Sequence, residues 1–181
     1  IPVAEIKAAI AAFTGVLRRF DYQLRTNEVV FIDDYAHHPE ELKATINSVK
    51  ELYPNDKILG IFQPHLYTRT RDFAEGFGTS LSLLDEVLLL DIYPARELPI
   101  PGVTSEMILN LITTPSKSVV TKDKLIEKVL TSDARVILTL GAGDIDQFVA
   151  PLKNALMSKH QITMISLDQL VSEKHQYRKF K

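Results

Sequence analysis

Four residues that could bind a metal ion or a polar substrate lie within six positions of the chain: Asp33, Asp34, His37 and His38. Two carboxylates and two imidazoles suit hard and borderline metal ions, but the other polar segments offer few further ligands. Alternatively, an Asp and a His-Pro pair ahead of a helix satisfy its free N–H groups. A third hypothesis fits best: a carboxylate at a strand end accepts hydrogen bonds from a ribose or a substrate amine, and the imidazoles orient polar groups.

Two pairs of arginines are candidate anion contacts. Arg69 and Arg71 lie at the expected start of a helix, where guanidinium groups and the helix terminus both attract carboxylates and phosphates. The plainer interpretation is a solvated basic turn in which an arginine pairs with Asp72. Arg18 and Arg19 are either surface charges or anion contacts on a linker, and spacing alone does not decide between these interpretations.

The segment GAGD, residues 141–144, only partly matches the dinucleotide-binding pattern GxGxxG. Gly141 and Gly143 supply the first two glycines, but Asp146 stands at the third position, and Asp144 and Asp146 would repel a pyrophosphate. We therefore expect a tight turn between a strand and a helix. The chain has no GxxxxGK[ST] phosphate-binding loop, so no complete activity can be assembled from it.

The elements that must position these residues follow from hydrophobic spacing. The sequence predicts helices over 3–13, 39–52, 68–84, 105–112, 122–130 and 145–156, and strands over 29–32, 57–62, 86–93, 117–120 and 135–140. This alternation favours an α/β layer with a mostly parallel sheet covered on both faces. Ligands bind beyond the carboxyl ends of such strands. Four polar segments each follow an expected strand: DDYAHHP, QPHLYTRTR, DIYPARE and GAGD. We therefore expect these four loops to form one site.

Composition fits a single domain of ordinary globular type. The 181 residues are 45% hydrophobic and 24% charged, with a net charge of −2 that does not suggest a polyanion-binding surface. The absence of cysteine excludes disulfides and thiolate metal sites. The sequence contains neither a signal-peptide pattern at its start nor an apolar run of the roughly 20 residues needed to span a membrane.

Five segments resemble, in order and spacing, the alanine-adding members of the Mur ligase family: FTGVLRRF, DDYAHHPEE, FQPHLYTRTRD, DIYPARELPIPGVTSE and GAGDI. The resemblance implies the C-terminal domain, a Rossmann-like three-layer sandwich, of a three-domain cytoplasmic enzyme of peptidoglycan synthesis. Such enzymes join L-alanine to UDP-N-acetylmuramate through an acyl phosphate made from ATP. The implied partners of this chain are the N-terminal domain, which binds UDP, and the central domain, which holds the P-loop and Mg²⁺.

The resemblance also implies roles for individual residues. Arg19, at the hinge between domains, and Asp34 correspond to ATP contacts of the family. The pocket for alanine and its carboxylate would be formed by four residues: Tyr35, His37, His65 and Arg69. His38 and Pro39 would start a helix. Leu66 stands where many relatives carry Arg, and Arg96 where Gly is common.

The resemblance divides the chain into three parts: the end of the central domain with the hinge (1–20), the C-terminal domain (21–160), and a final strand or tail (161–181). Three alternatives stay open. One is a related tripeptide ligase that recycles muropeptides. Another is a metal-dependent hydrolase built on Asp33, Asp34, His37 and His38. The last is a non-enzymatic module that binds an anion with the Arg69/Arg71 loop.

Overall fold

A six-stranded sheet forms the centre of the computed structural model, which describes residues 1–13 and 15–161. Its strands lie in the order β1-β2-β6-β3-β4-β5. They are β1 (Asp21–Arg25), β2 (Val30–Asp34), β3 (Ile58–Phe62), β4 (Glu86–Leu89), β5 (Ser116–Val119) and β6 (Val136–Leu140). Only the β1–β2 pair is antiparallel, and the four other pairs are parallel. The mostly parallel sheet predicted from the sequence is confirmed.

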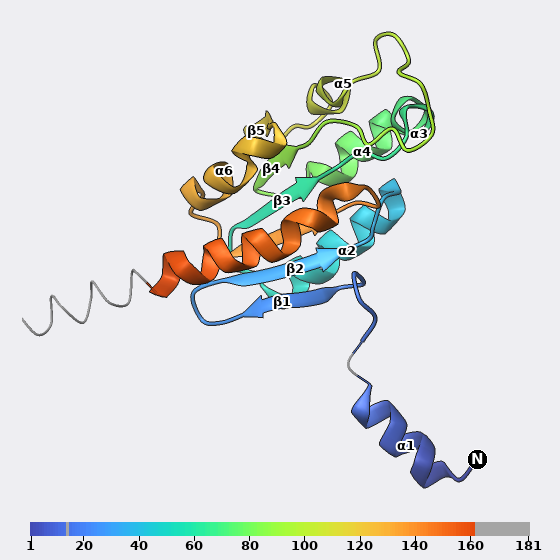
Figure 1. Ribbon diagram of the computed structural model, residues 1–181, viewed down its shortest axis with the longest axis vertical. Coiled ribbons are helices and arrows are strands. Elements are labelled where there is room, and N and C mark those ends of the chain that lie inside the picture. Colours follow the sequence, from blue (N-terminus) through green and yellow to red (C-terminus); the bar gives the residue numbers. More distant parts are fainter. Residues whose placement is uncertain (14, 162–181) are drawn as a thin grey trace, which may run out of the picture.

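Helices cover both faces of this sheet and make three layers (Figure 1). One core lies between the sheet and the helices α2 (Pro39–Leu52), α4 (Ala74–Leu81) and α5 (Ser105–Leu109). The other core lies between the sheet and α6 (Leu125–Thr131) with the helix at 149–161. Successive side chains of a strand point to opposite faces, so Ile32 joins the first core and Phe31 the second. This two-sided burial explains why the central strands are continuously apolar.

The sequence reading missed β1 at the sheet edge. Tyr22 and Leu24 alternate with polar residues, which is a strand signal, and Thr26 accepts and donates hydrogen bonds in the turn to β2. The pairing register shifts between Tyr22 and Leu24. As a result Tyr22 packs against the first core and Leu24 against the second. The short, bulged, partly exposed strand gave only a weak pattern.

The single helix expected over 68–84 is wrong. The chain instead forms α3 (Tyr67–Asp72) and then α4, with a break at Phe73. Phe77, Leu81 and Leu84 are buried as the helical spacing predicted, but Phe73 is 41% exposed and its ring packs against His38 with centroids 4.6 Å apart. The break places Arg69 and Arg71 on a separate short helix.

The segment before the sheet contains α1 (Val3–Ala12), the helix predicted there. None of its residues is buried, and it lies apart from the sheet in Figure 1. No helix within the described ranges is long and apolar enough to cross a membrane. The predicted final strand or tail falls almost wholly on 162–181, outside the described residues.

Candidate functional site

Four polar loops meet at the carboxyl edge of the sheet, as predicted. The loops after β2 and β6 are joined where Gly141 N donates to Asp34 O at 3.2 Å. The loops after β3 and β4 run parallel at an isolated bridge between His65 and Tyr93, beside which Leu66 N donates to Tyr93 O at 2.9 Å. Backbone pairing therefore continues past the ends of the strands and brings the four loops together.

Asp33 and Asp34 at the end of β2 have different environments. Asp33 is 1% exposed and accepts hydrogen bonds from Thr139 Oγ1 at 2.7 Å and Arg18 Nε at 3.1 Å. Burial raises the pKa of the Asp33 carboxyl above its ordinary value, although these two donors partly oppose the shift. Asp34 accepts from the backbone N–H groups of Phe20 at 2.7 Å and Ala36 at 2.8 Å. Both carboxylates therefore fix local structure as well as lining the edge.

The turn after Asp34 orients Tyr35 and His37 before α2 begins at Pro39. His37 Nδ1 lies 2.9 Å from Tyr35 O. Glu41 Oε2 accepts from the backbone N–H groups of His37 at 2.9 Å and His38 at 3.2 Å. Partial burial raises the pKa of Glu41, but the His37 N–H bond and the other contacts with His37 and His38 outweigh this and lower it overall. His38 and Pro39 start the helix, as expected from the sequence.

An aromatic and basic cluster forms where the loops after β2, β3 and β4 meet. The His65 ring stacks on the Tyr93 ring with centroids 5.7 Å apart. The His37 ring lies edge-on to the His65 ring, with centroids 6.1 Å apart. Arg69 Nη1 lies 3.4 Å from His65 Nδ1. Burial, then the positive charges of Arg69 and His37, lower the pKa of His65 below 6.5. His65 therefore lies beside a permanently charged guanidinium that disfavours its protonation.

The two arginines of α3 differ in what they contact. Arg71 Nε pairs with Asp72 at 2.7 Å, and both side chains are about half exposed, which is the solvated ion pair of the plainer interpretation. Arg69 is partly buried beside His65.

The first turn of α3 is fixed from the loop after β4, because Glu97 accepts hydrogen bonds from Thr68 N at 2.9 Å and Thr68 Oγ1 at 2.5 Å.

Leu66 and Arg96, the two positions where the sequence resemblance led us to expect other residues, have different backbone conformations. Leu66 has a positive φ of 71°, which is unfavourable for a residue with a β-carbon. Near Arg96, the left-handed residue is the preceding Ala95 with φ of 50°. Arg96 itself therefore has no left-handed conformation.

The linker before β1 places Arg18 and Arg19 over Tyr35. The Cζ atoms of the two guanidinium groups lie 5.1 Å and 5.9 Å from the Tyr35 ring centroid. Arg19 is exposed, whereas Arg18 is partly buried and reaches the strand ends. The six residues predicted for the site therefore all lie on the linker, at the end of β2, or on the loops and short helix at the carboxyl edge.

Sequence reasoning missed Gln63, which organises the GAGD turn. Gln63 is 1% exposed; its Nε2 donates to Asp144 Oδ1 at 2.8 Å, and its Oε1 accepts from Ile145 N at 2.9 Å. Asp144 also pairs with Lys122 at 2.5 Å. The signal was a lone amide directly after a fully apolar strand. The turn leads into a 3₁₀ helix at Asp144–Phe148, as the tight-turn prediction required.

The Asp/His cluster gives no support to the metal hypothesis. Asp33 and Asp34 direct their oxygen atoms to different donors. Over residues 1–13 and 15–161, no group of three or more His, Cys, Asp or Glu side chains could hold a metal ion.

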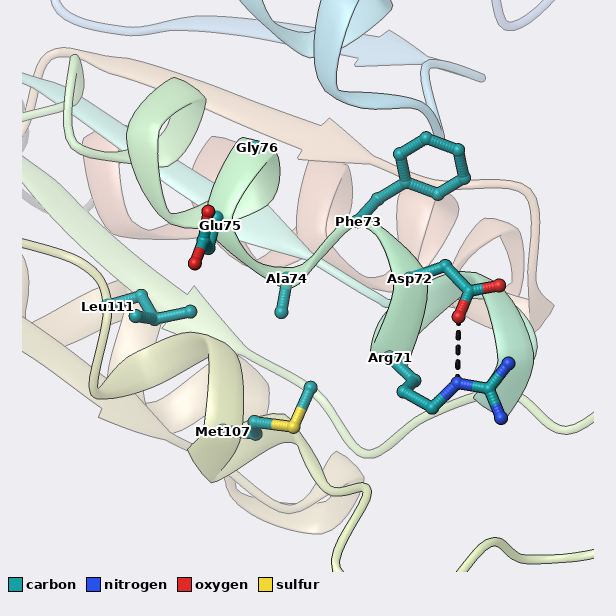
Figure 2. A pocket seen from close by; sticks show the side chains of 8 residues that line it. All are labelled: Arg71, Asp72, Phe73, Ala74, Glu75, Gly76, Met107 and Leu111. Carbon is teal, nitrogen blue, oxygen red and sulfur yellow. Dashed lines mark hydrogen bonds and ion pairs between the residues drawn. The ribbon is translucent and has the colours of Figure 1, made fainter.

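A separate pocket of about 490 Å³ lies beside α3, α4 and α5 (Figure 2). Met107 and Leu111 line one side of it and the Arg71–Asp72 ion pair lies on the other. None of the six predicted site residues lines this pocket, so it is distinct from the candidate site.

The fold and the loop cluster define an α/β domain with polar and aromatic loops at the carboxyl edge of its sheet, and comparison assigns its family. The family model for the Mur ligase glutamate ligase domain matches residues 18–143, so the chain belongs to the Mur ligase family. The chain is 57% identical over 152 residues to a UDP-N-acetylmuramate–L-alanine ligase of Parabacteroides distasonis, covering 84% of this chain and 33% of the relative. It is 52% identical over 155 residues to the enzyme of that name from Flavobacterium johnsoniae, covering 86% and 34%.

Two solved structures share this fold. The UDP-N-acetylmuramate–alanine ligase of Thermotoga maritima matches with a TM-score of 0.69 and 30% identity over 87% of this chain and 34% of that one. A murein peptide ligase of Psychrobacter arcticus shares the fold, with a TM-score of 0.63 and 22% identity over 82% of this chain and 32% of that one. The chain thus spans about a third of the length of these relatives.

Proposed function

We propose that this chain is the C-terminal domain of a UDP-N-acetylmuramate–L-alanine ligase, the part that binds L-alanine and closes over ATP. Identities of 57% and 52% to ligases of that name support the choice of substrate over the tripeptide alternative. Residues 1–20 would be the end of the central domain and the hinge, and 21–160 the domain itself. The fully unburied α1 supports such a division. A cytoplasmic location follows from the proposed function alone.

The observation that carries the proposal is the contact between Arg69 Nη1 and His65 Nδ1 at 3.4 Å in the loop cluster, where burial and the charge of Arg69 lower the pKa of His65. Every amino-acid substrate presents a carboxylate, which a guanidinium binds through charge-assisted hydrogen bonds. The lowered pKa of His65 disfavours a second positive charge there, which would repel the substrate ammonium group. Tyr35 and His37, on the facing loop, would close the other side of the alanine pocket.

Arg19 and Asp34 would contact ATP in the closed enzyme. Arg19 is exposed on the linker, and a guanidinium suits phosphate. Asp34 already accepts two backbone hydrogen bonds, but carboxylate oxygens have further lone pairs for a ribose hydroxyl. The central domain would supply Mg²⁺ and the phosphate-binding loop. In the described part of this chain, no group of three or more His, Cys, Asp or Glu side chains could hold a metal ion.

In the proposed reaction, ATP phosphorylates the lactyl carboxylate of UDP-N-acetylmuramate to an acyl phosphate. The amine of alanine attacks its carbonyl carbon, and the tetrahedral intermediate expels phosphate to leave an amide. The contribution of this chain would be to bind and orient alanine and to cover ATP, which is catalysis by proximity and exclusion of water.

The test is phosphate release by the complete protein that contains this chain, with ATP, Mg²⁺, UDP-N-acetylmuramate and L-alanine. We expect turnover that requires all four, and none from the 181-residue chain alone. Turnover with an L-alanyl tripeptide in place of L-alanine would support the recycling ligase instead. Robust turnover by the isolated chain would contradict its proposed role as one domain of the active site.

A further inference from the structure

Arg18 joins the linker to the ends of two neighbouring strands. Its Nε donates to Asp33 Oδ2 at 3.1 Å, and its Nη2 donates to the backbone oxygen of Gly141 at 2.7 Å. The same guanidinium lies over the Tyr35 ring, with Cζ 5.1 Å from the centroid. Both partners are buried: Asp33 lies one residue before the end of β2, and Gly141 directly follows β6. One side chain from outside the sheet therefore contacts both loops at the centre of the carboxyl edge.

The backbone around Arg18 is held by the same edge. Arg18 O accepts from Tyr35 N at 2.7 Å, and Phe20 N donates to Asp34 Oδ2 at 2.7 Å. Arg18 and Phe20 have positive φ values of 58° and 47°. Such conformations are unfavourable outside glycine and persist only where surrounding contacts fix them. Arg19 lies between these two residues, so its place on the linker depends on those contacts.

We infer that Arg18 is a positioning residue that holds Arg19 and Tyr35 in one arrangement and so couples the ATP contact to the alanine pocket. The inference rests on the proposed function of those two residues. A lysine at position 18 would keep the charge, but a single ammonium group cannot reproduce the planar donor pair shared between Asp33 and Gly141 or its stacking on Tyr35.

The test compares Arg18→Lys with Arg25→Lys in the complete ligase. Arg25 is a matched control because it also lies over a tyrosine, Tyr22, at 4.9 Å, but on the edge strand β1. In Arg18→Lys we expect the KM values for both ATP and L-alanine to rise by about ten-fold, the effect of losing roughly one charge-assisted hydrogen bond. The KM for UDP-N-acetylmuramate should stay within about two-fold, and Arg25→Lys should change none of the three.

Hydrogen exchange by mass spectrometry on the same proteins gives a readout that is independent of ligase activity. Peptides covering 16–20 and 33–38 should exchange faster in Arg18→Lys, while a peptide covering β3 should be unchanged. Unchanged exchange in the first two peptides would overturn the inference, as would faster exchange throughout the domain. A rise in the KM for ATP alone would also overturn it, because Arg18 would then contact the nucleotide itself. If the wild-type protein does not use alanine, the proposed function fails, yet exchange still decides whether Arg18 fixes the linker.

Discussion

Gln63 and Asp144, 81 positions apart in the sequence, are joined by a hydrogen bond of 2.8 Å from Nε2 to Oδ1. Gln63 Oε1 also accepts from the backbone N–H of Ile145 at 2.9 Å. This one buried amide holds the start of the 3₁₀ helix against the loop after β3. The loops after β3 and β6 are therefore fixed relative to each other by side-chain as well as backbone contacts.

Replacing Gln63 with Leu should destabilise the chain by about 2–3 kcal/mol. The change keeps the side-chain size, removes two hydrogen bonds and leaves the Ile145 N–H buried without its partner. Urea unfolding followed by circular dichroism measures the loss. Gln147→Leu is the control, since Gln147 is exposed in the same 3₁₀ helix. Equal effects of the two substitutions would contradict the role given to Gln63.

Gly141→Ala should cost more stability than Gly102→Ala. Both glycines have positive φ, 139° and 80°, so both substitutions impose backbone strain of about 1–2 kcal/mol or more. A β-carbon at Gly141 would lie 2.8 Å from Gln63 O, whereas one at Gly102 would meet nothing within 4 Å. The clash should add roughly 1–3 kcal/mol. Thermal unfolding of the two variants checks the order, and a Gly102→Ala effect as large as that of Gly141→Ala would refute the argument from close packing.

The imidazole of His65 should titrate below 6.5, because burial, Arg69 and His37 all lower its pKa. NMR titration of its ring protons measures the midpoint. Arg69→Gln removes a neighbouring positive charge and should move the midpoint upward. Arg71→Gln should leave it unchanged, since Arg71 is paired with Asp72. A midpoint that ignores Arg69→Gln would remove Arg69 from the environment of His65.

The same shift has a consequence for stability. Between the lowered pKa of folded His65 and about 6.5, the unfolded chain binds more protons than the folded chain, so this residue makes the free energy of unfolding rise with pH across that window. It loses that contribution as the pH falls through the folded pKa. His65→Gln should flatten this part of the pH dependence in urea unfolding. An unaltered slope would show that other groups produce it.

Arg69→Ala in the complete ligase should raise the KM for L-alanine by about ten- to a hundred-fold, the effect of losing a charge-assisted bond to its carboxylate. The KM for ATP should change little. Arg71→Ala is the matched control on the same helix, because Arg71 pairs with exposed Asp72 whereas Arg69 contacts His65. Steady-state kinetics with alanine as the varied substrate decides, and an unchanged KM for alanine would exclude Arg69 from the pocket.

The sequence by itself determined the α/β class, the alternation of strands and helices that makes the sheet mostly parallel, and the edge of the sheet at which the polar loops meet. Continuous apolar strands and the helical stripe of α2 carried this information, because burial on both faces of a sheet leaves a direct mark on residue type. It also predicted that GAGD forms a tight turn between a strand and a helix, and the structure has that turn between β6 and the 3₁₀ helix at Asp144–Phe148.

Only the tertiary structure decided how the residues of those loops divide their roles. Arg18 and Arg19 are alike in sequence, but one contacts buried Asp33 and the other is exposed. Arg69 and Arg71 are likewise alike, yet one lies beside His65 and the other pairs with its neighbour. These differences arise from positive φ values, a break between helices and contacts across more than a hundred positions, such as the bond from Arg18 to Gly141. Local residue patterns do not encode such long-range contacts, which exist only once the sheet has assembled.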